Sequence, residues 1–182
     1  LDLVIDIINS TDNSAPGPDG IPFAAYRAVV EDVAPVFLTA IQALMKGEKP
    51  SANFNAGILH LLPKKATDRI EDTRPLVINN TNNRIIASVI QASIQPSIES
   101  ILSNKQNGFR EKRTTIDNID YLNKRFYEAM ENKKFCDILF VDFLKAFDSI
   151  AHEAIFELLK EVGFSFEYQN VIKALFHKAH CY

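Results

Sequence analysis

Asp142 is the residue whose type and setting most directly suggest chemistry, because it stands in the otherwise apolar run ILFVDF at residues 138–143. Five of these six residues are apolar and several are β-branched or aromatic, so the run predicts a strand of about residues 136–143 that is buried on both faces. An ionised carboxylate at the end of such a strand is costly unless a cation, a charged partner or water meets it. Asp142 therefore caps a turn, pairs with a lysine such as Lys145, or holds a metal ion.

The glycines of the sequence exclude one class of metal-dependent protein. Nucleotide-hydrolysing folds also use a strand-end aspartate to hold Mg²⁺, but they need a phosphate loop of the form GxxxxGK[ST], which is missing here. The stretch GPDGIP at residues 17–22 lacks the lysine–hydroxyl pair and predicts a turn.

The two cysteines, Cys136 and Cys181, show neither a disulfide framework nor metal-binding spacing, which favours a reducing compartment.

The composition is that of an ordinary globular domain, with 182 residues, 47% hydrophobic and 24% charged. The net charge of −3 is unevenly distributed, since residues 60–113 carry nine basic and five acidic side chains and both flanking segments are net acidic. A positive middle segment can attract polyanions or can be a solvated loop surface, and charge alone does not choose between them. Because the chain starts at Leu1 and not at a methionine, we expect it to be part of a longer protein.

The elements that must position Asp142 follow from the apolar spacing. A short helix opens the chain, and a second helical region covers about residues 23–46, with a break near Pro35 and a stop at Gly47. Strands are predicted at residues 57–62 and 74–78, as an antiparallel pair joined by the charged loop 64–73. Asn80 or Asn82 is expected to cap the next helix, which Pro96 kinks or splits. The apolar stripe of this helix consists of Ile85, Ile86, Val89, Ile90 and Ile94.

The second half of the chain is expected to be helical around the apolar strand. A helix is expected from about Asp117. Its inward face should carry Ile116, Ile119, Leu122, Phe126 and Met130. The strand at 137–143 should lie in a separate, more central sheet, and Asp148 or Ser149 should cap the next helix. That helix is expected to bury Ile150, Ala154, Ile155, Leu158 and Val162, and a last helix to bury Val171, Ile172, Leu175 and Phe176. This order of elements predicts an α+β fold.

Four stretches of the sequence resemble the motifs of one family. DFLKAFDSIAH, at residues 142–152, resembles the first palm motif of the reverse transcriptases of non-LTR retrotransposons and, more distantly, of group II intron enzymes. SAPGPDGIP (14–22) is similar to the opening segment of that family, and ILHLLPKK with DTRPLVINN (58–65 and 72–80) to its fingers strands. QNGFREKRTTIDNI (106–119) is similar to its template-side fingers motif. The four motifs occur in the order of the family and span nearly the whole chain.

The resemblance implies a fold, an activity and partners. The fold would be a fragment of a right-hand polymerase, with about residues 1–113 mainly in the fingers and about 114–182 at the start of the palm. The activity would be that of an RNA-directed DNA polymerase that uses dNTPs and Mg²⁺, with Mn²⁺ as a substitute metal. Its partners would be an RNA template with a DNA primer and the remainder of the polymerase chain. The expected location is the nucleus or the cytoplasm.

The resemblance also implies roles for residues of the palm motif. Asp142 would be the catalytic carboxylate and a Mg²⁺ ligand, and the backbone carbonyl of Phe143 a further ligand. Two Mg²⁺ ions commonly assist nucleotidyl transfer, and Mg²⁺ prefers a few carboxylates together with substrate phosphates and water. Phe147 would lie beneath the sugar of the incoming nucleotide and exclude a 2′-hydroxyl by its bulk. Packing in the core is the alternative role for this ring.

The basic hairpin is expected to meet the triphosphate of the nucleotide. By the resemblance, Lys64 and Arg74 contact it, and Lys65 is a less specific match. Arginine suits this role because its planar fork of donors matches phosphate oxygens. A solvated basic hairpin with no ligand is the alternative.

The template-side motif supplies the last set of expected site residues. Gln106, Gly108, Phe109 and Arg110 match the residues that bind the template in the family. Gly108 would let the backbone approach the strand closely, and Arg110 and Arg113 would meet phosphates.

One motif of the family is missing from the chain. The sequence contains no YxDD-like turn, which would supply the remaining metal-binding carboxylates. We therefore expect a chain that ends before the second metal-binding motif and is inactive alone. The alternative is a non-catalytic nucleic-acid-binding or scaffold remnant of a decayed retroelement. RNA binding with a strong salt dependence would distinguish that remnant from a fragment without function.

Overall fold

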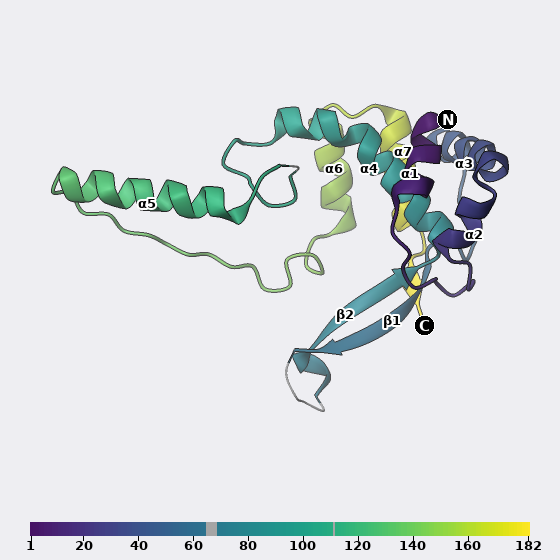
Figure 1. The fold of residues 1–182 in the computed structure, drawn as a ribbon, viewed down its shortest axis with the longest axis horizontal. Coiled ribbons are helices and arrows are strands. Elements are labelled where there is room, and N and C mark those ends of the chain that lie inside the picture. Colours follow the sequence, from purple (N-terminus) through teal and green to yellow (C-terminus); the bar gives the residue numbers. More distant parts are fainter. Residues whose placement is uncertain (65–68, 111) are drawn as a thin grey trace. The chain divides into compact units, whose positions relative to one another are not determined.

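The structure is a computed structural model that describes residues 1–64, 69–110 and 112–182, which fall into two compact units. The first unit comprises residues 1–93 and 151–182, and the second comprises residues 94–150. The elements in chain order are α1 (Asp2–Ser10), α2 (Phe23–Ala28), α3 (Val30–Met45), β1 (Ala56–Pro63), the 3₁₀ helix η1 (Ile70–Asp72), β2 (Thr73–Asn79), α4 (Thr81–Ile101), α5 (Thr115–Glu131), α6 (His152–Glu161), α7 (Phe166–Phe176) and β3 (His180–Cys181) (Figure 1). No helix in the described part of the chain is long and apolar enough to cross a membrane.

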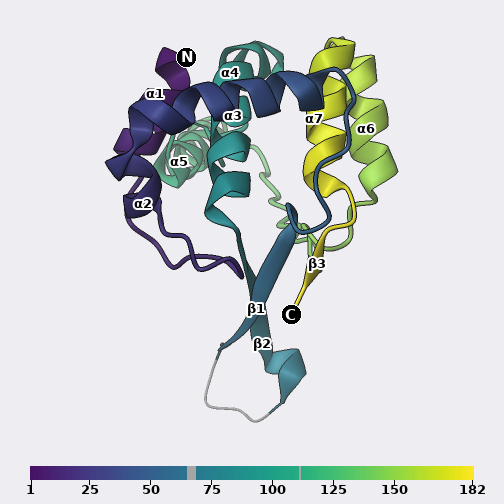
Figure 2. The same ribbon diagram turned by 90° about the vertical axis from the view of Figure 1, so that its right-hand side faces the viewer.

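The core of the first unit lies between α1, α3, α7 and the first half of α4. Helix α3 packs against both α1 and α7, and Figure 2 shows it lying across them. The buried apolar side chains of these helices recur at three- and four-residue spacing, as one face of an amphipathic helix requires. They are Val4, Ile8, Ala34, Phe37, Ile41, Leu44, Ile85, Ile86, Val89, Ile90, Val171 and Ala174. The predicted opening helix is therefore present, and four of the five residues in the predicted stripe after Asn80 are buried, whereas Ile94 is half-buried.

The second helical region breaks at a different residue from the predicted one. Val29, with φ −129° and ψ 34°, leaves the helical conformation and separates α2 from α3. Pro35 lies inside α3, where its missing N–H removes only one bond near the start of the helix. Helix α4 likewise runs through Pro96 without being split. The prediction of a stop at Gly47 is confirmed, since α3 ends at Met45 and Gly47 has φ +92°.

Strands β1 and β2 form the predicted antiparallel hairpin. Their register pairs Gly57 with Asn79 and Pro63 with Thr73. The two-residue strand β3, which the sequence did not predict, adds to the other edge of β1 in a parallel orientation. The backbone N–H of Tyr182 donates to the carbonyl of Gly57 at 3.0 Å. The sheet of the described residues is therefore small and mixed, with the order β2-β1-β3, and Figure 2 shows the hairpin extending away from the helices of this unit.

The glycine-rich opening segment packs against the start of α4. A Cβ on Gly17 would lie 2.4 Å from the backbone nitrogen of Asn80, so only glycine fits there without a shift. Asn80 immediately precedes α4, as predicted, but its side chain does not cap the helix. Its Oδ1 accepts from the backbone N–H of Asp19 at 3.1 Å, and its Nδ2 donates to the carbonyl of Asn53 at 3.1 Å. Asn80 thus ties two loops to the helix start.

The partly buried side chain of Arg84 completes the attachment of the opening segment. Arg84 donates through Nη1 to Oγ of Ser14 at 2.7 Å and through Nη2 to the carbonyl of Ala15 at 2.8 Å. Its guanidinium also lies 5.0 Å from the ring centroid of Phe23. Burial lowers the pKa of this guanidinium. Arginine stays protonated in proteins at neutral pH, so Arg84 remains charged and holds the opening segment in place.

In the second unit, the predicted strand at 136–143 is wrong. Residues 134–143 form neither helix nor strand, and Figure 1 shows them as a plain trace after α5. Leu139, Phe140 and Val141 are all exposed. A strand exists only when a second strand accepts and donates its backbone hydrogen bonds. No described residue pairs with this segment, so its apolar sequence has no partner on which to fold.

Helix α5 is present, but its predicted inward stripe is wrong for the same reason. Thr114 and Asp117 form a capping box at its start, in which the N–H of Thr114 donates to Oδ2 of Asp117 at 2.9 Å. Ile116, Ile119, Phe126 and Met130 are exposed, and Leu122 is half-buried. The periodicity predicted the helix correctly, whereas the partner that would cover this stripe is not among the described residues.

The start of α6 also corrects a prediction. The helix begins at His152 with Ala151 at the N-cap, so neither Asp148 nor Ser149 caps it. Residues 144–149 instead form consecutive turns, in which the N–H of Ser149 donates to the carbonyl of Lys145 at 2.9 Å. The predicted burial on α6 is wrong as well, because the described part of the chain leaves Leu158 exposed and no residue of this helix fully buried. The last helix does bury Val171, as predicted.

Candidate functional site

The first group of candidate site residues lies at the end of the hairpin where β1 ends and β2 begins. Arg74 stands directly opposite Leu62, and Lys64 follows β1 by one residue, so both cations belong to the same end of the hairpin. The backbone N–H of Lys64 donates to the carbonyl of Asp72 at 2.9 Å. Both side chains are exposed, and neither has a partner among the described residues. Lys65 lies outside the described residues.

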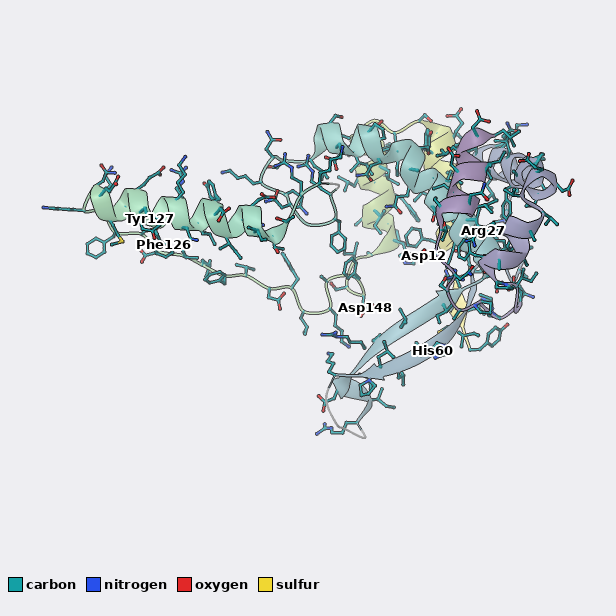
Figure 3. The ribbon with its side chains drawn as sticks, viewed as in Figure 1. Asp12, Arg27, His60, Phe126, Tyr127 and Asp148 are labelled. Carbon is teal, nitrogen blue, oxygen red and sulfur yellow. The ribbon has the colours of Figure 1, made fainter. Side chains whose placement is uncertain are left out.

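The faces of the hairpin are apolar apart from these cations. Directly opposite residues share a face, so Arg74 lies with Leu62, His60 and Leu76. Figure 3 shows His60 on the hairpin. The other face carries Leu59, Leu61, Pro75 and Val77, and most of these side chains are exposed. An exposed apolar surface next to cations that pair with no described residue suits a ligand with a flat apolar part and an anionic part, as a nucleotide has.

The second group lies in the second unit and contains the residues around Asp142. Asp142 and Phe143 are exposed within the extended segment, and Phe147 lies in the turns that precede α6. Figure 3 shows Asp148, the last residue of the matched DFLKAFD motif, in the same turns. Phe147 is 79% exposed, so its ring is not packed in a core formed by the described residues. Its ring instead meets that of Phe109 edge to face, with centroids 5.9 Å apart and an interplanar angle of 87°.

Phe109 belongs to the loop of residues 103–110, which is called the template-side loop after the motif that it matches. Arg110 organises this loop. The guanidinium of Arg110 contacts Oε2 of Glu99 through Nη2 at 2.6 Å and through Nε at 2.8 Å. Its Nη1 donates to the carbonyls of Ser103 at 2.9 Å and Gln106 at 3.2 Å. The Arg110 side chain is only 6% exposed. Its hydrogen bond holds the pKa of the Glu99 carboxyl below the usual range, so this pair is charged at neutral pH.

The other residues of the template-side motif remain open to a ligand. Gln106 and Phe109 are exposed, and Phe109 has a positive φ of 60°, a strained conformation for an aromatic residue. A Cβ on Gly108 would meet only the Gln106 side-chain nitrogen, at 3.9 Å. The described residues therefore leave room for a side chain at position 108, and their packing does not require glycine there.

The described residues supply only part of a possible metal site. Among the described residues, no group of three or more His, Cys, Asp and Glu side chains lies close enough together to hold a metal ion. The carboxylate of Asp142 and the carbonyl of Phe143 are oxygen ligands of the kind that Mg²⁺ prefers, but Mg²⁺ requires about six ligands in an octahedron. These two oxygens would supply only two of those six ligands.

The structure forms a cavity that the sequence did not predict. It is formed in the second unit by the loop before α5 and the first turns of α5, and it includes Lys105, Asn107, Asn118 and Tyr121. Isolated polar residues of this kind carry no periodic signal, so only the tertiary arrangement shows them to be neighbours. Hairpin residues Lys64 and Arg74 belong to the first unit, and the remaining candidate site residues belong to the second.

Comparison with known families identifies the class of this protein. Residues 62–180 match the family described as reverse transcriptase (RNA-dependent DNA polymerase). Because the match covers more than half of the chain, the protein belongs to the reverse transcriptase family. The resemblance predicted from the four motifs is thereby confirmed.

Curated proteins with similar sequences come from transposable elements. The chain is 26% identical to the transposon TX1 uncharacterized 149 kDa protein of Xenopus laevis, over 93% of this chain and 13% of that protein. It is 25% identical to the probable RNA-directed DNA polymerase from transposon BS of Drosophila melanogaster, over 62% of this chain and 12% of that protein. It is 27% identical to the Pol polyprotein from the type-2 retrotransposable element R2DM of the same fly, over 83% of this chain and 14% of that protein. The chain thus spans between 12% and 14% of the length of these three relatives.

Proposed function

We propose that this chain is the part of a retroelement RNA-directed DNA polymerase that binds the RNA template and the incoming dNTP. The family match and the transposon relatives support the class of protein. The observation that carries the proposal is the contact between Phe109 and Phe147. One ring belongs to the motif expected at the template and the other to the motif expected at the nucleotide, so the contact joins the two motifs into one surface.

Each exposed site residue has a role in this proposal. Lys64 and Arg74 bind the triphosphate, because both cations are exposed and Arg74 lies on an apolar hairpin face. Phe147 lies beneath the sugar and excludes a 2′-hydroxyl. Asp142 and the carbonyl of Phe143 hold Mg²⁺ together with ligands from the remainder of the polymerase. When bound, the metal would activate the primer hydroxyl and stabilise the pyrophosphate that leaves.

Within the template-side loop, one residue maintains the loop conformation and three residues contact the RNA. Arg110 gives its Nε, Nη1 and Nη2 to Glu99 and to two loop carbonyls, so it holds the loop in shape. Gln106, Gly108 and Phe109 are left facing outward to meet the RNA. Through the loop shape, Arg110 acts on the template indirectly. The assignment of residues 1–113 to the fingers and 114–182 to the palm of a right-hand polymerase remains a prediction.

RNA binding by the 182-residue chain tests the proposal. We expect a labelled single-stranded RNA to bind with an affinity that falls steeply with salt, because each phosphate contact contributes about 0.7 to the slope of log K against log salt. Phe109→Ala should weaken binding by about tenfold if a base stacks on this ring. Tyr127→Ala, which removes an exposed aromatic ring from α5 outside the motif (Figure 3), is the matched control and should leave binding unchanged. Absence of RNA binding by the wild-type chain would contradict the proposal.

A second candidate function is a non-catalytic RNA-binding or scaffold protein derived from a retroelement. The observation in its favour is that Asp142 belongs to no group of three or more possible metal-binding side chains in the described part of the chain. Both candidates predict RNA binding, so polymerase activity separates them. A chimera in which residues 1–182 replace the matching segment of an active relative should extend a primer under the first candidate and should be inactive under the second.

A further inference from the structure

The direction of the β1–β2 hairpin is set at its base, where β1 begins and β2 ends. Side chains 59–63 and 74–77 are all exposed, and Figure 2 shows the hairpin extending away from the helices of the first unit. Asn79 ends β2, and Arg74 lies about 17 Å from it along the strand, at about 3.3 Å per residue. A tilt of about 3° at the base would therefore move this cation by about 1 Å.

Three asparagine side chains, called the amide chain here, are linked by hydrogen bonds at this base. The Nδ2 of Asn79 donates to Oδ1 of Asn83 in α4 at 3.3 Å. The Nδ2 of Asn83 donates in turn to Oδ1 of Asn55, the residue before β1, at 2.7 Å. Asn55 is 3% exposed and Asn83 is 4% exposed. The amide chain therefore joins the base of both strands to α4 in the interior of the first unit.

The amide chain ends at the C-terminus of α7. The Nδ2 of Asn55 donates to the carbonyl of Ala174 at 2.8 Å and to that of His177 at 2.7 Å. Carbonyls at the C-terminus of a helix lack their usual intrahelical donors, so they accept from side chains of this kind. Strand β3 follows α7, and the N–H of Leu59 donates to the carbonyl of Tyr182 at 3.0 Å. The end of α7 thus holds the start of β1 through a side chain, and β3 holds it through the backbone.

Gly57 leaves room for the outer end of the amide chain. It pairs directly with Asn79 across the two strands. A Cβ at position 57 would lie 2.7 Å from Oδ1 of Asn79 and would also collide with the side chain of Val77. A larger residue at position 57 would therefore displace the amide of Asn79 from Asn83.

Hydrogen bonds fix a direction that apolar packing leaves free. Burial of apolar surface is non-directional, whereas an N–H donor prefers an angle above about 150° towards its acceptor. Both buried amides, those of Asn55 and Asn83, donate and accept within the amide chain. A tilt of the hairpin would leave buried amide atoms without partners, which is costly. The amide chain therefore resists tilting.

We propose that Asn55, Asn79 and Asn83 are positioning residues, which fix the direction of the hairpin and thereby place its cations at the triphosphate of the dNTP. This proposal rests on the proposed function, in which Lys64 and Arg74 bind that triphosphate. The three amides act through the strands and not by contact with the nucleotide. Loss of the amide chain leaves both cations present but misplaced, and an error of about 1 Å in position can cost about a hundredfold in rate.

The direction of the hairpin is tested first, on the 182-residue chain. Spin labels are attached at Val36 of α3 and Leu62 of β1, both exposed, after the two exposed cysteines are changed to serine. The distance between the labels should show one narrow distribution. Asn83→Leu, which keeps a similar volume and removes both side-chain hydrogen bonds, should shift or broaden it. Ile90→Ala, a core change in the same helix outside the amide chain, is the matched control and should leave it unchanged.

The consequence for the nucleotide is measured in the active chimera, at a temperature where thermal melts show each variant to be folded. Asn83→Leu should lower kcat/KM for dNTP by at least about tenfold, and Ile90→Ala should leave it nearly unchanged. The same Asn83→Leu change is then made in a chimera that already carries Lys64→Gln and Arg74→Gln. It should cost little more there, because two changes that act through the same contact are not additive.

The possible outcomes separate this inference from the proposed function. If Asn83→Leu leaves the label distance unchanged, or if Ile90→Ala changes distance and kcat/KM equally, the positioning proposal is overturned and the proposed function stands. A full tenfold loss in the chimera without the two cations also overturns it, because Asn83 then acts by another route. If Lys64→Gln and Arg74→Gln together leave kcat/KM for dNTP unchanged, or if the chimera is inactive, the proposed function fails and the positioning proposal fails with it.

Discussion

The rings of Phe109 and Phe147 meet edge to face, 5.9 Å between centroids, although the residues lie 38 positions apart in the sequence. Both rings are largely exposed. The contact therefore contributes little to a core, yet it links the loop proposed to bind the template with the turn proposed to bind the nucleotide. Aromatic rings that are exposed to this degree and still paired are well placed to meet a third flat group.

Phe147→Ala should leave the stability of the chain nearly unchanged. An aromatic pair is worth about 0.5–1.5 kcal/mol, whereas removing a phenylalanine from a core costs about 3–5 kcal/mol. In the active chimera, the same substitution should raise ribonucleotide use relative to deoxyribonucleotide use by about tenfold, because the clash with the 2′-hydroxyl is removed. The measurements are a thermal melt and the ratio of kcat/KM for dNTP over rNTP.

Phe109→Ala is the control for the sugar preference. It removes the same ring contact from the other side and should leave the ratio unchanged. If both substitutions shift the ratio equally, or if Phe147→Ala lowers the melting temperature and leaves the ratio as it was, the sugar-gate role of Phe147 is wrong.

The Glu99–Arg110 pair should make the order of the template-side loop depend on pH. The pKa of Glu99 is lowered in the folded state, first by its hydrogen bond with Arg110, relative to about 4.3 in an unfolded chain. A group whose folded pKa is depressed stabilises the fold above its unfolded pKa, and this contribution is lost as the pH falls through the folded value. The protection of residues 103–110 against amide exchange, measured relative to the intrinsic exchange rate at each pH, should therefore fall as the pH drops below the unfolded value of about 4.3.

Glu99→Gln supplies the control for this pH dependence. The substituted amide can still accept a hydrogen bond from Arg110 but does not titrate. Loop exchange in this variant should be faster than in the wild type at neutral pH and should show no further change with acid beyond the intrinsic one. A pH dependence that persists in Glu99→Gln would assign the effect to another group.

Gly17→Ala should destabilise the first unit by about 1–3 kcal/mol, the usual cost of overpacking. The added Cβ would lie 2.4 Å from the backbone of Asn80, and the backbone cannot move aside as the end of a side chain can. Gly108→Ala is the matched control, since its Cβ would meet nothing closer than 3.9 Å. We expect a change within about 0.5 kcal/mol for that variant. Denaturant unfolding measures both, and equal effects would contradict the close packing at Gly17.

The β1–β2 hairpin and the helices of the first unit could be predicted from the sequence because the residues that pair with them or cover their apolar faces are among the described residues. The spacing of Val4 and Ile8, for example, buries one helix face within the described residues. The strand predicted around Asp142 could not form in the same way, because a strand depends on a partner that the local sequence does not specify. The contacts of Asn80 could not be predicted either, since a buried amide in a loop leaves no periodic pattern.

The same distinction holds for the candidate site. Family motifs identified Asp142, Phe147 and the residues of the template-side loop one by one. Only the structure shows that Phe147 contacts Phe109 and that Arg110 is engaged within its own loop. A motif gives the type and order of residues, whereas their contacts depend on how the loops fold.

The 182-residue chain alone should extend no primer. Two Mg²⁺ ions need more carboxylate oxygens than Asp142 supplies, and no described residue group completes the set. Incubation with a primed RNA template, dNTPs and Mg²⁺, followed by analysis of primer length, measures this directly. Extension by the purified chain that disappears in Asp142→Ala would show that it carries a complete active site.

Templated primer extension by the chimera tests the central claim most directly, with Asp142→Asn set beside Asp137→Asn. Both aspartates are exposed and lie in the same extended segment, so the two substitutions remove the same charge from the same surroundings. If Asp142 holds the catalytic metal, the unmodified chimera and Asp137→Asn extend the primer, and Asp142→Asn is slower by at least about a thousandfold, or about 4 kcal/mol in the activation barrier. Extension at similar rates in all three proteins, or equal losses in both variants, would contradict the claim.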